Sequence, residues 1–87
     1  MTMTASDFTA ARKTLGLTQA QLADALGMGR RTIVDIEAGA SAVRRWHVLA
    51  LERLSLAAAA EHRDPMRAAP SVRREALDLA ALIRGDN

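Results

Sequence analysis

The chain has 87 residues, a formal net charge of +2, no cysteine, and only 2% aromatic residues. These values exclude disulfides, thiol catalysis and cysteine-ligated zinc, and they leave room for a single small domain. Nineteen alanines and eleven leucines favour helices, whereas the β-branched and aromatic residues that fill strands are scarce. The composition therefore predicts an all-α fold.

The first two predicted helices are short, and a glycine ends each of them. The first spans about residues 6–15, with Ser6 as its N-cap. The second follows Thr18, and Gln21 stands three residues later, as in a capping box. Gly27 ends this helix in the way that a C′ glycine does.

Three further helices follow. The third spans residues 30–38 and starts after a separation of only two residues. The fourth begins between residues 41 and 46 and continues to about residue 60. The fifth spans residues 71–84, with Ser71 as N-cap and an apolar stripe along one face.

Two prolines divide the chain into three parts. Residues 1–62 form the predicted body, residues 63–70 a loop, and residues 71–87 a C-terminal amphipathic helix. A helix of this length is not stable alone, and a chain this small gains from oligomerisation. We expect the last helix to form a homodimer contact, with docking on its own chain as the alternative.

The second and third helices form a pattern typical of DNA-binding proteins. Two short helices joined by a three-residue turn with glycine make a helix-turn-helix. The second helix of such a pair places its N-terminal side chains in the major groove, and here Arg30 and Arg31 occupy those positions.

Residues 8–54 resemble the phage repressor and Cro class of helix-turn-helix proteins, also called XRE-type. The residues that carry the pattern are Leu15, Gly16, Leu17, Thr18, Gln19, Leu22, Ala23, Gly27, Thr32, Ile33, Ile36, Glu37 and Gly39. The resemblance implies a lambda-repressor-like bundle of five helices. It also implies a transcriptional regulator, and we expect a repressor that binds an inverted-repeat operator in double-stranded DNA as a dimer.

The resemblance also implies roles for individual residues. The expected base-reading positions are Gly29, Arg30, Arg31 and Asp35; the phosphate-binding positions are Thr18, Gln19, Thr32, Arg44 and Arg45; and Arg12 and Glu37 form an internal salt bridge. The chain departs from the family where Gly29 replaces a serine or threonine, where Ala38 replaces an asparagine, and where Arg44 replaces a proline.

Some of these residues have a second interpretation. Asp35 either accepts a hydrogen bond from cytosine N4 or pairs with Arg31 one turn away on the same helix. Arg44 and Arg45 either clamp a phosphate or are solvated. Trp46 falls at an apolar position of the fourth helix, so we expect it in the protein core rather than stacked on a base.

Other classes of function find little support. The two histidines lie far apart in the sequence, and neither has cysteine or carboxylate neighbours at the spacing of metal ligands. No set of catalytic residues is visible either, so we expect no enzyme, metal or cofactor. No apolar run reaches the ~18 residues of a membrane span, and no secretory signal is visible, so we expect a cytoplasmic protein without a membrane partner. Two alternatives remain, namely the antitoxin of a toxin–antitoxin pair and a protein-interaction module that does not bind DNA.

Overall fold

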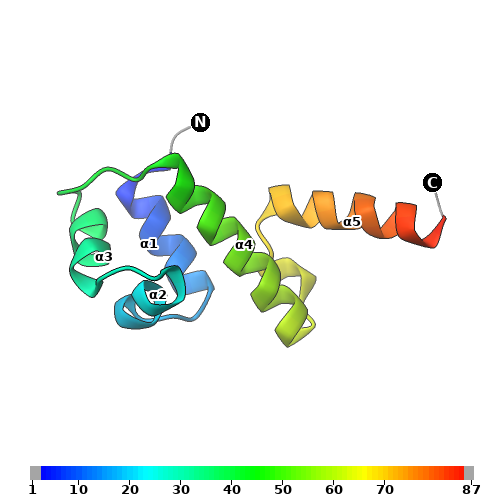
Figure 1. Cartoon of the computed structure of the whole chain (residues 1–87), viewed down its shortest axis with the longest axis horizontal. Coiled ribbons are helices and arrows are strands. Elements are labelled where there is room, and N and C mark those ends of the chain that lie inside the picture. Colours follow the sequence, from blue (N-terminus) through cyan, green and yellow to red (C-terminus); the bar gives the residue numbers. More distant parts are fainter. Residues whose placement is uncertain (1–2, 86–87) are drawn as a thin grey trace. The chain divides into compact units, whose positions relative to one another are not determined.

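The computed structural model describes residues 3–85, and it contains all five predicted helices (Figure 1). They are α1 (Ala5–Thr14), α2 (Gln19–Leu26), α3 (Arg30–Glu37), α4 (Arg45–His62) and α5 (Pro70–Arg84), with a 3₁₀ turn η1 (Pro65–Arg67) before the last. No strand occurs among the described residues, so the all-α prediction is confirmed. None of these helices is both long enough and apolar enough to cross a membrane.

Contacts divide the chain into two compact units. The first ends at Leu51 and the second begins at Glu52, so the division falls inside α4. The sequence placed its boundary in the loop at residues 63–70 instead. Within the second unit, the Ser55 hydroxyl in the second half of α4 accepts one hydrogen bond from the Ala69 N–H, just before α5.

The N-cap of helix α1 lies two residues earlier than predicted, because it is Thr4 and not Ser6. The Thr4 hydroxyl accepts a hydrogen bond from the Asp7 N–H at 3.1 Å, and the Asp7 carboxylate accepts one from the Thr4 N–H at 3.0 Å. These reciprocal bonds form a capping box, and they also hold the pKa of Asp7 below its ordinary value. Ser6 has no such partner three residues on, since position 9 is a threonine.

The core of the first unit is small and apolar. Phe8, Leu22, Ile33 and Ile36 are its largest fully buried side chains, and they come from α1, α2 and α3. Helix α3 packs against both of the other two helices. Burial of each such side chain stabilises the fold by roughly 1.5–3 kcal/mol, so this cluster holds α3 in place with its polar side outward.

Helix α4 turns a different face inward than the sequence predicted. Trp46 is 49% exposed and Leu49 is 52% exposed, whereas His47 is 4% exposed and Leu51 is buried. The prediction of Trp46 in the core was therefore wrong. His47 and Leu51 lie four residues apart on one face, and Trp46 lies about a quarter of a turn away from it.

The second unit holds the end of α4 and the start of α5 together through polar contacts. The Ser55 hydroxyl donates to the Glu52 carbonyl at 2.7 Å and accepts from the Ala69 N–H at 2.9 Å. Helix α5 then begins at Pro70, not after Ser71 as predicted. Proline suits the first helical position because it has no N–H to leave unpaired. The Ser71 hydroxyl instead donates to the Glu52 carboxylate.

Candidate nucleic-acid interface

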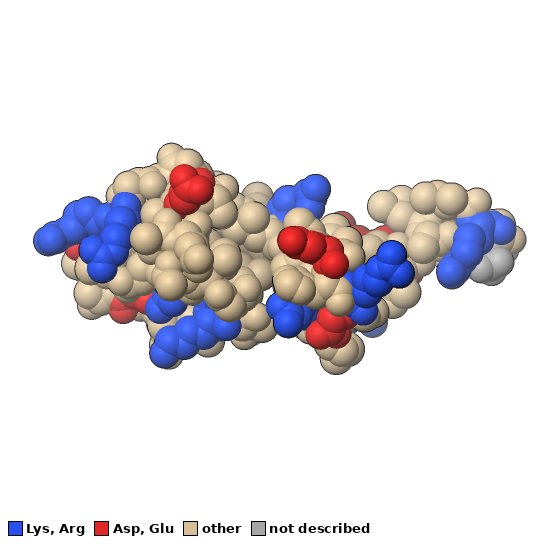
Figure 2. All heavy atoms as spheres, turned by 90° about the horizontal axis from the view of Figure 1, so that it is seen from below, with Lys and Arg blue, Asp and Glu red and all other residues tan. Residues whose placement is uncertain are grey.

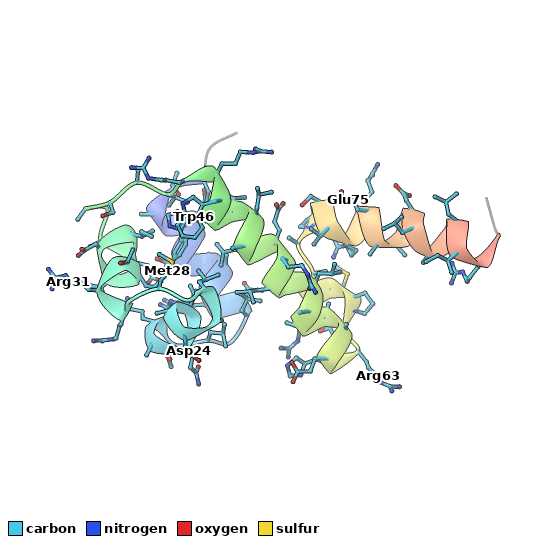
Figure 3. The ribbon with its side chains drawn as sticks, viewed as in Figure 1. Asp24, Met28, Arg31, Trp46, Arg63 and Glu75 are labelled. Carbon is cyan, nitrogen blue, oxygen red and sulfur yellow. The ribbon has the colours of Figure 1, made fainter. Side chains whose placement is uncertain are left out.

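The turn between α2 and α3 is held by glycine conformation and by backbone hydrogen bonds. Gly27 adopts φ 69°, in the left-handed region that disfavours other residues, and the Met28 N–H donates to the Ala23 carbonyl at 2.8 Å. Met28 lies between the two helices (Figure 3). Gly29 then acts as N-cap of α3 without a side-chain hydrogen bond. The turn therefore places the first residues of α3 at the surface.

Arginine side chains project from the start of α3. Arg30 and Arg31 are both exposed, and Arg31 points away from the helix (Figure 3). Figure 2 shows Lys and Arg atoms projecting from the end of the first unit where α3 lies. The Arg31 side chain is 87% exposed, and its Nε donates to the Asp35 carboxylate at 3.1 Å. The intrahelical pairing of Asp35, one of its two interpretations, is thus present in the structure.

The structure brings Arg12 and Glu37 together as the resemblance implies. Arg12 Nε donates to Glu37 Oε2 at 2.6 Å, and Arg12 Nη2 donates to Glu37 Oε1 at 3.0 Å. Their side chains are only 13% and 8% exposed. Arg12 Nη1 also donates to the Leu17 carbonyl at 2.9 Å. This bidentate pair fastens α1 and the loop before α2 to the end of α3.

Gln19 belongs to the same cluster. Its Nε2 donates to Glu37 Oε1 at 3.2 Å, so the side chain expected at a phosphate is anchored by α3. Hydrogen bonds from Arg12 hold the pKa of Glu37 below its ordinary value, against the opposing effect of burial, and the Gln19 bond adds to the lowering. Glu37 is therefore ionised at neutral pH and fixes two side chains at the start of α2 and in α1.

Thr18 caps α2, and its hydroxyl is already engaged. It accepts from the Gln21 N–H at 3.1 Å, while the Gln21 side chain accepts from the Thr18 N–H at 2.9 Å. The predicted capping box is thus present. The remaining N–H groups in the first turn of α2 have no intrahelical acceptor, and such a helix start attracts phosphate.

A surface hollow lies beside α3 and the start of α4. Its volume is about 450 Å³, and it is lined by Met28, Thr32, Ile36, Ala40, Ser41, Ala42, Arg44, Trp46 and His47. Thr32 and Arg44, two of the expected phosphate-binding residues, are exposed and line this hollow together. Arg45 is exposed at the first position of α4. The hollow therefore combines hydroxyl and guanidinium donors with the half-exposed ring of Trp46.

His47 organises the start of α4, a role the sequence analysis missed. Its Nδ1 accepts from the Arg44 N–H at 2.8 Å, and its ring lies 3.9 Å from that of Trp46, centroid to centroid. Within residues 3–85, Nε2 has no hydrogen-bond partner. Burial lowers the pKa of His47, and the positive charge of Arg44 lowers it further. The signal was its place three residues after Arg44, where a side-chain acceptor can reach back to the N–H at the helix start, as the third residue of a capping box does.

The residues expected at an interface thus fall into three groups. The structure places Gly29, Arg30, Arg31 and Asp35 on α3 or at its cap, Thr18 and Gln19 at the start of α2, and Thr32, Arg44 and Arg45 around the hollow or beside it. No group of three or more histidine, aspartate or glutamate side chains among the described residues could hold a metal ion. The arrangement offers cationic and neutral donors to a polyanion.

Comparison with known proteins agrees with this geometry. A sequence model described as helix-turn-helix matches residues 9–54, just over half of the chain. No curated protein and no solved structure matches the chain. The matched segment contains α2, the glycine turn and α3, together with the Arg12–Glu37 pair. The chain belongs to the XRE-type, lambda-repressor-like helix-turn-helix family of DNA-binding regulators.

Proposed function

We propose that the chain is a transcriptional repressor that recognises an inverted-repeat operator in double-stranded DNA as a homodimer. The observation that carries the proposal is the exposed start of α3, where Arg30 and Arg31 follow a glycine turn on a helix packed against α1 and α2. A helix presented in this way can enter the major groove and place its N-terminal side chains against base edges.

The expected contacts divide into positioning and reading. Phosphate contacts set the register of the protein on DNA, and contacts to base edges supply specificity. Thr32, Arg44 and Arg45 supply phosphate contacts around the hollow beside α3. Arg30 and Arg31 read bases, because a guanidinium matches the O6 and N7 acceptors of guanine.

The start of α2 adds a second phosphate contact. Thr18 contributes through the helix start that it caps, and Gln19 contributes through the part of its amide that Glu37 does not engage. Gly29 carries no side chain, and nothing of the described chain lies within 4 Å of where a Cβ would stand, so the cap of α3 is open to DNA. With the contacts around the hollow beside α3, the DNA backbone would then be held at two places on the first unit.

The dimer is proposed from the apolar side of α5. Leu79, Leu82 and Ile83 are between 57% and 84% exposed, and clusters of exposed apolar side chains often mark an interaction surface. A second copy that covers them would relate two recognition helices by a two-fold axis. The operator would then contain half-sites about 10–10.5 base pairs apart, or a multiple of that spacing.

Salt-dependent titration of duplex DNA tests the DNA-binding proposal. Affinity should fall steeply as salt rises, because phosphate contacts release counterions. A double variant, Arg30→Ala with Arg31→Ala, should bind at least roughly tenfold more weakly. Its matched control, Arg53→Ala with Arg74→Ala, removes the same charge from exposed positions outside the interface and should bind nearly as well as the wild type. Equal losses in both would refute base reading by α3.

Analytical ultracentrifugation tests the dimer. Leu79→Glu with Ile83→Glu should abolish self-association, whereas Arg74→Glu on the polar side of α5 should not. A wild-type chain that remains a monomer at all concentrations would refute the dimer. That outcome would favour a different protein on the apolar side of α5, as the antitoxin alternative requires.

A further inference from the structure

The charge pattern of α3 is unfavourable for a helix by itself. Its first turn carries Arg30 and Arg31 and no acidic residue, although the N-terminus of a helix favours negative charge. Asp35 then follows in the second half of the helix, and an acid four residues after a base is the weaker order for an intrahelical pair. Helix stability therefore does not account for this arrangement.

The pair itself leaves one part of the arginine free. Asp35 Oδ1 accepts from Nε of Arg31 at 3.1 Å, which occupies the side edge of the guanidinium. The two terminal nitrogens, Nη1 and Nη2, remain available as a fork. Such a fork matches two acceptors side by side, as guanine offers with O6 and N7, whereas adenine offers one acceptor and one donor there.

Arg30 provides the contrast on the same helix. The residues three and four positions after it are Ile33 and Val34, so the helix places no carboxylate beside it. Within residues 3–85, no carboxylate forms an ion pair with Arg30. Its guanidinium is free to turn toward a phosphate or a base. Arg31 is the arginine whose direction the structure restrains.

We infer that Asp35 is a positioning residue that directs Arg31 onto a guanine of the operator and keeps it off the phosphate backbone. The inference rests on the proposed function and deepens it. Two effects of the carboxylate contribute. Its hydrogen bond to Nε orders the side chain before binding, which reduces the entropy lost in the complex. Its negative charge also repels phosphate, which disfavours the sequence-independent contact that an unrestrained arginine makes.

The roles of the pair can be separated by selecting bound sequences from a pool of random duplex DNA. When the sequences selected by the wild type are aligned, one position should be a guanine that depends on Arg31, which we call the guanine column. Guanine should be preferred there by roughly 5- to 150-fold over other bases. Arg31→Ala should remove that column. Arg31→Lys, which keeps the charge but loses the fork, should flatten it as well.

Asp35→Asn should weaken the preference for guanine in the same column by roughly tenfold. This is the effect expected when one charge-assisted hydrogen bond is lost in a complex where DNA shields the pair from water. It should also raise affinity for unrelated DNA. The matched control is Asp24→Asn, which removes the same charge from an exposed residue of α2 (Figure 3). That control should leave the guanine column intact, and so separates positioning from net charge.

Several outcomes would overturn the inference. If Asp35→Asn changes a different column from Arg31→Ala, Asp35 reads a base of its own. If Asp35→Asn leaves the site unchanged, or Asp24→Asn has the same effect, the pair does not direct recognition. In each of these cases the proposed DNA binding stands. If the wild type selects no sequence at all, sequence-specific DNA binding itself fails.

Discussion

Removal of the Glu37 carboxylate should destabilise the fold strongly. Glu37 accepts two hydrogen bonds from Arg12 and one from Gln19. The Arg12 side chain is only 13% exposed with Glu37 in place, and in Glu37→Ala its guanidinium would keep only its bond to the Leu17 carbonyl. The variant would therefore leave a largely buried cation without its counterion.

The magnitude follows from the burial of both partners. Removal of one member of a fully buried ion pair costs about 3–5 kcal/mol. Since Arg12 and Glu37 retain slight exposure, we expect about 2–4 kcal/mol. At about 4–8 °C per kcal/mol for a domain of this size, the melting temperature should fall by roughly 8 °C or more.

Chemical and thermal denaturation followed by circular dichroism would measure the change. Asp35→Ala is the matched control, because it breaks an ion pair whose arginine side chain is 87% exposed, and exposed pairs contribute about 0–1 kcal/mol. A double variant, Arg12→Met with Glu37→Leu, should recover most of the stability, since apolar side chains can replace a buried pair. If Glu37→Ala were within about 0.5 kcal/mol of the wild type, the argument would be refuted.

Four other predictions concern pH and the glycine turn. Because the folded pKa of Glu37 is lowered, its contribution should be present above its ordinary value of 4.5 and lost as pH falls below it; urea melts of the wild type and Glu37→Gln would show this. The folded pKa of His47 is lowered too, so stability should fall as pH drops below 6.5, and His47→Gln should remove that slope. Gly29→Ser should stabilise the fold by about 0.5–1 kcal/mol, because serine is a better N-cap and restricts the unfolded chain more than glycine does. Gly27→Ala at φ 69° should destabilise the fold by about 1–2 kcal/mol in the same melts.

The helices could be predicted because they depend on short-range signals, whereas the roles expected of the site residues came from the family resemblance and stay predictions. The Thr18 capping box and the Gly27 terminus act within a few residues, so the sequence alone specifies α2. The pairing of Arg12 and Glu37 could not be derived from spacing, since 25 positions separate them. It followed only from the resemblance to a family whose fold brings those positions together.

The errors occurred where two local signals competed. Ser6 and Ser71 are good caps in isolation, but Thr4 has a reciprocal partner in Asp7, and Pro70 starts α5 before Ser71 can cap it. A hydroxyl at a helix start caps only when the next turn offers it a partner and the backbone is still extended. The sequence shows the candidates, and the backbone path chooses between them.

The sequence by itself determined the all-α fold, the order of five helices and the position of the helix-turn-helix, because composition, caps and glycine terminators act locally. Only the tertiary structure decided which face of α4 is buried. Trp46 is the more apolar residue, yet His47 is inside, because its ring packs edge-on against Phe8 and its Nδ1 caps the helix. The tertiary structure also decided that Gln19 is anchored by Glu37. The inward face of a helix depends on what it packs against, and that partner comes from distant parts of the chain.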